Sequence, residues 1–291
     1  MQYGGEKMPE RNRSAHKLKG IPPVLWINLD ADTERRQHME SQFENWEITN
    51  HTRIVGIDGR EDDPSVHLKG QVPHTMIPNE IACCMSHLKA IKYYIEEMDT
   101  PEIMIMEDDA LFETVRGWPF TYREASALFP YNFDAMQLST INPACVYMTL
   151  HNRFINDFSA AVYVLKRAHA QKVYNAHIRG DKFKLDQDIR PRATSEDVIL
   201  ESGRVYCIPL FLYRLDLGSS IHPEHIEIFH RNSFNGIVNF WNESNRIEDW
   251  KQLFNWNCYL GRLPPGWDEN GPIEGHPDAP QSPEPPKDVS E

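Results

Sequence analysis

The strongest constraint on the fold comes from residues 79–98 and the apolar run that follows them. Within residues 79–98 apolar side chains recur every three or four positions, which predicts one long amphipathic helix. Pro101 interrupts this pattern, and the sequence Ile-Met-Ile-Met at 103–106 then predicts a short strand that is buried on both faces. A long helix beside such a strand is typical of a parallel sheet covered by helices.

The same alternation extends over most of the chain. Short apolar runs predict further strands at 24–27, 52–56, 135–138, 161–165 and 205–212, and helical patterns follow at 32–45 and after residue 165. We therefore predict an α/β fold, a Rossmann-like single domain with a mostly parallel central sheet. In such a fold the crossovers are right-handed and ligands bind beyond the carboxyl ends of the strands.

Charge and composition exclude several classes of protein. The 291 residues carry a formal net charge of −13, which argues against a nucleic-acid partner because phosphate contacts need a basic surface. No run approaches the roughly 18 apolar residues of a transmembrane helix, and the N-terminus lacks the apolar core of a signal peptide. We expect a cytoplasmic protein without a transmembrane segment. The five cysteines form no CxxC pair, so a disulfide scaffold or a zinc ribbon is disfavoured.

The two ends of the chain differ in composition from its centre. Residues 1–20 are polar and basic without periodicity, and residues 263–291 contain eight of the 21 prolines. Neither segment carries enough apolar side chains to form a core, so we expect a flexible N-terminal tail, a domain over residues 21–262 and a Pro-rich disordered tail. The last segment is also compatible with a ligand for a module that binds polyproline.

Three consecutive carboxylates, Glu107, Asp108 and Asp109, follow directly after the apolar run at 103–106. Such charges repel one another unless a cation or hydrogen-bond donors compensate them. Mg²⁺ and Mn²⁺ prefer oxygen ligands and usually bridge to substrate phosphates. In an extended segment Glu107 and Asp109 would share a face, so one could bind the metal while the other contacts a nucleotide. The alternative is a solvated acidic turn.

A second candidate site lies at the end of the first predicted strand. Asn28, Leu29 and Asp30 lead from this strand into a helix that carries Arg35 and Arg36. Such a turn offers backbone N–H groups and a positive dipole end to an anion, and arginine pairs well with diphosphate oxygens. The chain has no GxGxxG, GxxxxGK[ST], GxSxG or HExxH motif, so the dinucleotide, P-loop and common hydrolase signatures are missing.

Acidic residues later in the chain could supply a general base. Glu196 and Asp197 precede the apolar residues 198–200, and a carboxylate at a cleft edge can take a proton from an acceptor hydroxyl. His222 follows the sequence Ser-Ser-Ile and could complete an oxygen-rich metal site. A solvated acidic loop and a surface histidine are the simpler interpretations.

Several of these motifs together resemble glycosyltransferase family 25, the group of lipooligosaccharide and collagen-type glycosyltransferases. The closest matches are WINLD at 26–30 with the arginines at 35–36, RIVGIDG at 53–59, EIACCMSHLKA at 80–90 and MEDDA at 106–110. Looser matches occur at 161–165, 197–200 and 220–221. The family pattern often has Ser-Asp-Ile where residues 219–221 are Ser-Ser-Ile, so polar contacts there differ.

This resemblance implies a GT-A fold, a nucleotide-sugar donor that is usually a UDP-sugar, a divalent ion that is usually Mn²⁺ but is sometimes Mg²⁺, and inversion at the anomeric carbon. The acceptor would be a hydroxyl of a glycan or a glycoprotein. Glu107 and Asp109 would be the outer positions of a DxD-type motif, and Asp197 the base, with Glu196 as its rival. The remaining positions that it places near the nucleotide are Asn28, Leu29, Asp30, Arg36, Asp58 and Asp108.

Two other functions fit the same residues. A non-catalytic protein of this fold could bind nucleotide-sugars or carbohydrates without transferring them. A Mg²⁺-dependent phosphohydrolase could use the same acidic turn, although it would need a nucleophilic Asp with a Lys or Thr partner at a strand end.

Overall fold

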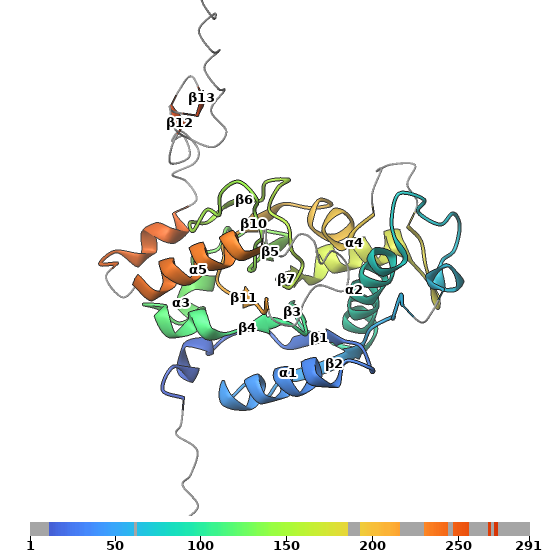
Figure 1. The fold of residues 1–291 in the computed structure, drawn as a ribbon, viewed down its shortest axis with the longest axis horizontal. Helices are drawn as coiled ribbons and strands as arrows, with labels where there is room; N and C mark the ends of the chain where they lie inside the picture. The colour runs from blue at the N-terminus through green and yellow to red at the C-terminus, as the bar shows by residue number, and fades with distance from the viewer. Residues whose placement is uncertain are drawn as a thin grey trace, which may run out of the picture.

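The computed structural model describes residues 12–60, 63–185, 193–215, 230–243 and 247–255, together with 267–268 and 271–272. A seven-stranded sheet lies at its centre, with helices on both faces (Figure 1). Its strand order is β2-β1-β3-β7-β5-β10-β6. The strands are β1 (Val24–Asn28), β2 (His51–Val55), β3 (Glu102–Glu107), β5 (Ala135–Gln137), β6 (His151–Asn152), β7 (Val162–Lys166) and β10 (Val205–Cys207).

Five of these strands run in one direction, and β7 and β6 run in the other. A mixed α/β architecture with a mostly parallel central sheet, as predicted, is therefore present. The sequence gives no warning of the reversal at β7. Because β7 is antiparallel to β3, its first residue, Val162, pairs with Met106 near the end of β3. The loop that precedes β7 thus reaches the same sheet edge as the carboxylates.

Alternate strand residues divide the core into two clusters. Val24 and Trp26 face one side of the sheet, and Leu25 and Ile27 face the other. The helices α2 (Pro78–Glu97) and α4 (Arg167–His177) cover the Leu25 side. The opposite side is covered by α1 (Thr33–Asn45), α3 (Tyr122–Ser126) and α5 (Arg231–Glu243). Both faces of the sheet are therefore buried, as the continuous apolar strands predicted.

The predicted helix at 79–98 is confirmed as α2, which begins with Pro78 at its first turn. Its stripe of Ile81, Met85, Leu88 and Ile91 is at most 2% exposed, so helical periodicity correctly identified the buried face. The predicted strand at 205–212 was only partly right. It forms β10 and then, after Pro209, a separate strand β11 (Leu212–Tyr213), which pairs with β4 (Ala110–Leu111).

Short elements complete the fold. They are η1 (Ala15–Leu18), η2 (Pro64–His67), η3 (Glu113–Gly117), the π-helical turn η4 (Glu196–Leu200), η7 (Trp250–Phe254), and the hairpins β8 (Ile178–Arg179) with β9 (Lys182–Phe183) and β12 (Trp267–Asp268) with β13 (Gly271–Pro272).

The ends of the chain only partly fall within the described residues. In the segment expected to be an N-terminal tail, Ala15 and Leu18 are buried and the Lys17 ammonium donates to the carbonyls of Arg116 and Trp118. Packing therefore begins before residue 21. Of the segment expected to be a Pro-rich tail, the described residues are the β12–β13 hairpin alone. None of the helices in the described part of the chain is long and apolar enough to cross a membrane.

Candidate functional site

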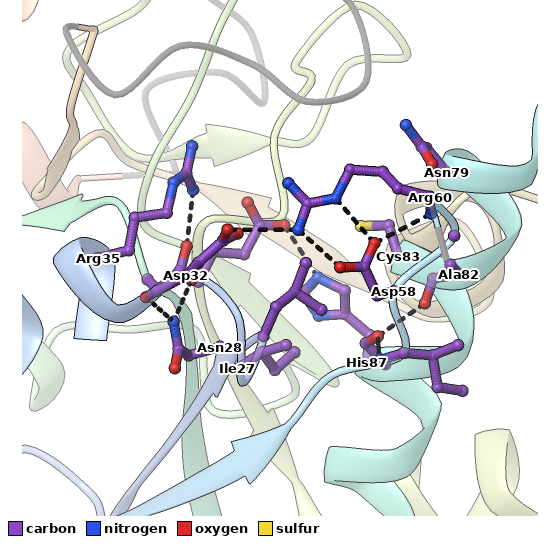
Figure 2. Close-up of a pocket in the computed structure, with 16 residues that line it drawn as sticks. Ile27, Asn28, Asp32, Arg35, Asp58, Arg60, Asn79, Ala82, Cys83 and His87 are labelled. Atoms are coloured by element: carbon purple, nitrogen blue, oxygen red, sulfur yellow. Dashed lines mark hydrogen bonds and ion pairs between the residues drawn. The ribbon is translucent and has the colours of Figure 1, made fainter. Parts of the chain in front are cut away.

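A pocket opens where the parallel strands β1, β2 and β3 end. It spans about 630 Å³, a volume that includes open solvent. Arg35 and Arg60 lie on opposite sides of this pocket, and Cys83 and His87 approach it from α2 (Figure 2). The lining residues are Ile27, Asn28, Leu29, Asp32, Arg35, Ile57, Asp58, Gly59, Arg60, Asn79, Ala82, Cys83, Ser86, His87, Glu107 and Asp108.

Asp108 is held firmly at the floor of this pocket. Its Oδ2 accepts a hydrogen bond of 2.7 Å from Asn28 Nδ2, and its Oδ1 lies 2.7 Å from Arg35 Nη1. Burial raises the pKa of the Asp108 carboxyl, while Arg35 and the Asn28 amide act in the opposite direction. Both carboxylate oxygens are therefore engaged by the protein itself, so Asp108 orients Arg35 and the end of β1.

Asp109 has a different environment. Its Oδ2 lies 3.8 Å from Arg35 Nη1, beyond hydrogen-bonding distance, and its Oδ1 is buried with no hydrogen-bond partner in the described part of the chain. Burial, followed by the charges of Glu107 and Asp108, raises the pKa of Asp109 to about 8, although Arg35 opposes the shift. A buried carboxylate oxygen without a partner is costly. A cation at this position would remove that cost.

Glu107 points toward α2. Its Oε1 lies 2.9 Å from His87 Nε2, and His87 Nδ1 lies 2.9 Å from the Tyr163 hydroxyl. His87 is 1% exposed, whereas the Glu107 side chain is 30% exposed, so the carboxylate reaches from a buried network toward solvent. The Cys83 thiol joins these two residues in a group whose ligand atoms lie within 4.8 Å of one another. Asp108 and Asp109 form a turn, so the fully extended geometry predicted for residues 107–109 is not present.

Asp58 and Arg60 form the rim next to α2. Arg60 donates to Asp58 through Nε at 2.8 Å and through Nη2 at 2.6 Å, and it reaches Asp32 at 3.3 Å. The side-chain hydrogen bond from Arg60 is the main cause that lowers the pKa of Asp58. Gly59 allows this turn to approach the helix, because a Cβ at this position would lie 2.7 Å from the Pro78 carbonyl oxygen.

Of the remaining residues that were predicted to lie near a nucleotide, one lines the pocket and two lie outside it. Leu29 lines the pocket beside Asn28. Asp30 lies outside the lining set; its side chain is 72% exposed and pairs with Arg53 at 2.6 Å. Arg36 also lies outside it, on the exposed surface of α1, where it pairs with Glu40 at 3.0 Å. The helix thus directs Arg35 rather than Arg36 toward the carboxylates.

The two candidate bases lie on η4, close to α2. Glu196 Oε1 accepts a 3.1 Å hydrogen bond from the backbone N–H of Ser159, and Asp197 Oδ2 accepts a long one, 3.4 Å, from Thr194 N–H. Burial, and then the charges of Glu107 and Glu196, raise the pKa of the Cys83 thiol well above its usual value. Burial, and then the charges of Glu196 and Asp197, raise the pKa of the neighbouring Cys84 thiol. Neither Glu196 nor Asp197 is among the residues that line the pocket, although Glu196 acts on the pKa of a lining residue, Cys83.

The Ser159 contact fixes the loop that enters β7. Ser159 has φ of 92°, a left-handed conformation that is uncommon for a residue other than glycine. Two residues later, the Ala161 carbonyl accepts a 2.8 Å hydrogen bond from the Glu107 backbone N–H. Glu196 thus stabilises a strained backbone beside the carboxylate turn, which is a structural task distinct from proton transfer.

His222, the third predicted metal ligand, lies outside the described residues. Sequence reasoning did not identify Arg60 as a pocket residue, although its position directly after the Asp58-Gly59 turn places it at the same strand edge. Arg35 could not be distinguished from Arg36, because the helix pattern at 33–45 is polar on most sides and gives no clear inner face.

The chain was also compared with known proteins. The family described as "Glycosyltransferase family 25 (LPS biosynthesis protein)" matches residues 21–186, which is more than half of the chain. Its match includes the strands that build the pocket and all three carboxylates at 107–109. No match was found among curated proteins.

Two solved structures show weak similarity. A crystal structure of a protein from STIV has 8% identity and a TM-score of 0.35, covering 66% of this chain and 84% of its own. The crystal structure of HddC from Yersinia pseudotuberculosis has 13% identity and a TM-score of 0.30, covering 65% of this chain and 71% of its own. Both TM-scores lie below 0.5, so the fold assignment depends on the topology of the chain itself.

Proposed function

The chain belongs to glycosyltransferase family 25, and we propose that it transfers a hexose from a UDP-sugar to a hydroxyl of a glycan or glycoprotein, with inversion and with the help of Mn²⁺ or Mg²⁺. The family supports the class of enzyme and the need for a donor and an acceptor. The GT-A type of fold, the UDP-sugar, the metal and the stereochemistry belong to the proposal.

The proposal of a metal ion rests on the surroundings of the two carboxylates Glu107 and Asp109, which follow β3. Asp109 Oδ1 is buried without a partner among the described residues, and Glu107 presents a partly exposed carboxylate whose charge acts on Asp109. Oxygen ligands of this kind suit Mg²⁺ and Mn²⁺. Glu107 and Asp109 would hold the ion, as the outer residues of a DxD-type motif. When bound, such an ion supplies positive charge that stabilises the diphosphate leaving group.

The protein's own groups can position the donor. Asn28 fixes the end of β1 through Asp108, and the turn from Leu29 onward leads to the N-terminus of α1, where backbone N–H groups favour an anion. The Arg60 guanidinium, whose side chain is 43% exposed, lies on the opposite rim, where a diphosphate oxygen would compete for it with Asp58 and Asp32. We place the nucleotide between these two walls.

The acceptor hydroxyl needs a base on the far side of the anomeric carbon. We assign this task to Asp197, the position that the resemblance to the family gives to the base; its Oδ2 accepts a long hydrogen bond, 3.4 Å, from Thr194 N–H. Glu196 is engaged by Ser159 N–H and by the Ser195 hydroxyl. Taking the acceptor proton at an Asp197 carboxylate oxygen would assist direct displacement of UDP and give the inverted product.

Incubation with a panel of UDP-sugars, and detection of released UDP, tests the proposal. We expect hydrolysis or transfer of one donor with Mn²⁺ and its loss with a chelator. The Glu107→Gln variant should lose this activity, whereas Glu113→Gln, at a side chain that is 54% exposed, should retain it. Binding of a UDP-sugar without turnover would instead favour a non-catalytic binding protein. NMR of the product's anomeric proton tests inversion.

A further inference from the structure

A second group of ligand-type side chains lies in the core, away from the pocket. His151 belongs to β6, Cys207 to the neighbouring strand β10, and Asp157 to the loop that leads to β7. Their exposures are 2%, 0% and 0%, respectively, and none of the three lines the pocket. One ligand atom of each lies within 4.8 Å of the other two. Three such groups rarely converge in a core without a partner ion or a defined protonation state.

The orientation of the His151 ring is fixed by its backbone contact. Nδ1 lies 2.6 Å from the Thr149 carbonyl oxygen, which can only accept, so Nδ1 carries a hydrogen. Nε2 then faces Asp157 Oδ2 at 3.1 Å. In the neutral ring this nitrogen has a lone pair that points at a carboxylate. Either a second proton shared by the two groups, or a metal ion bound by both, must therefore offset this repulsion.

The Asp157 carboxylate is also oriented by hydrogen bonds from residues outside the group of three. Its Oδ1 accepts a 2.9 Å hydrogen bond from Asn142 Nδ2, and its Oδ2 accepts one of 2.8 Å from Phe154 N–H. Asn142 is itself fixed, because its Oδ1 accepts from the backbone N–H groups of Ala144 and Cys145. A carbonyl on the distal ring nitrogen and an amide on the carboxylate are the outer contacts that orient ligands in metal sites.

We propose that His151, Asp157 and Cys207 bind a Zn²⁺ ion. Thiolate, carboxylate and neutral imidazole together carry two negative charges, so the complex would be electrically neutral and suited to burial. The Thr140 hydroxyl lies 2.8 Å from Cys207 Sγ and can donate a hydrogen bond to the thiolate. A water molecule would supply the fourth ligand. The site is independent of the proposed sugar transfer.

A proton on His151 is the competing occupant. Burial disfavours the charged ring, but the hydrogen bonds with Asp157 and Cys207 outweigh it and raise the pKa of His151 well above its usual value. The same anionic surroundings attract a metal ion. The two occupants differ in one measurable respect, since only a metal ion brings the Cys207 sulfur into a coordination sphere.

Titration of the metal-stripped full chain with Co²⁺ distinguishes them. We expect a thiolate-to-cobalt charge-transfer absorption that saturates at one ion per chain and is displaced by Zn²⁺. It should disappear in Cys207→Ser and persist in Cys83→Ser, which removes the thiol of the pocket group. Absence of the band from the wild-type protein, or its loss in Cys83→Ser alone, would overturn the assignment.

If the Cys207→Ser variant fails to fold, a second measurement takes its place. X-ray absorption at the zinc edge of the folded Cys83→Ser protein then decides the question. A sulfur neighbour of the zinc ion is expected, together with nitrogen and oxygen neighbours. A shell of nitrogen and oxygen alone, or no bound zinc after incubation with one equivalent, contradicts the site.

Discussion

Replacing Asp109 by Asn should change how the stability of the metal-free protein depends on pH. Burial holds the pKa of Asp109 near 8, against about 3.9 for an aspartate in an unfolded chain. Between these values the folded state binds the extra proton and the unfolded state does not. The contribution of the protonated Asp109 carboxyl to stability is fully present below about pH 4, decreases as the pH rises, and is lost above about pH 8.

The size of the effect follows from linkage. Each pH unit within this window changes the free energy of unfolding by about 1.4 kcal/mol for a group that is protonated only in the folded state. From pH 5 to pH 7 the wild-type protein should therefore lose about 2.7 kcal/mol relative to Asp109→Asn. This is an upper limit, because movement of Arg35 toward the carboxylate would lower its pKa.

Urea unfolding in the presence of a chelator, at pH 5, 6 and 7, measures this difference. Glu113→Gln serves as the control, since it also removes one carboxylate but at an exposed position. Addition of Mn²⁺ should stabilise the wild-type protein by about 2.7 kcal/mol at 100 times the dissociation constant, and should stabilise Asp109→Asn much less. If the wild-type and Asp109→Asn curves run parallel with pH, the buried, proton-binding state of Asp109 is wrong.

Three further changes test other parts of the molecule. Asp197→Asn should lower kcat by about 10²–10⁴-fold with donor affinity unchanged; near-full transfer by this variant, with loss in Glu196→Gln, would reverse the two roles. Gly59→Ala should lower stability by about 1–3 kcal/mol, because its Cβ would lie 2.7 Å from the Pro78 oxygen; an unchanged urea midpoint would show that the turn adapts. Deletion of residues 273–291 should leave the melting temperature and turnover nearly unchanged, since this segment is rich in proline and poor in apolar residues; a fall of several degrees would show that it packs on the domain.

The sequence predicted the elements whose burial is periodic. The stripe on α2 and the apolar run of β3 are local patterns, and each defines its own secondary structure. The direction of β7 is not local. The apolar sequence at 161–165 predicts a strand but not its direction in the sheet. That direction is set by antiparallel pairing with β3 on one side and with β5 on the other.

For the candidate site, too, the sequence predicted the location but not the contacts between its side chains. Position at a strand end identified Asn28 and Glu107 as site residues, the resemblance added Asp58, and all three line the pocket. The predicted residues Asp30, Arg36 and Asp109 are not among its lining residues. What each side chain does there was not predictable. Asp108 is bound by Asn28 and Arg35, while its neighbour Asp109 retains an oxygen that no described residue contacts by a hydrogen bond. This difference arises from contacts across 70 to 80 residues.

The contact between Asn28 and Asp108 also has a consequence for folding kinetics. It joins residues that are 80 positions apart, and it can form only after β1 has paired with β3, with β2 at the outer edge. Closing so large a loop is entropically costly, and chains with many such non-local pairings fold slowly. The pocket should therefore be among the last parts to form during refolding.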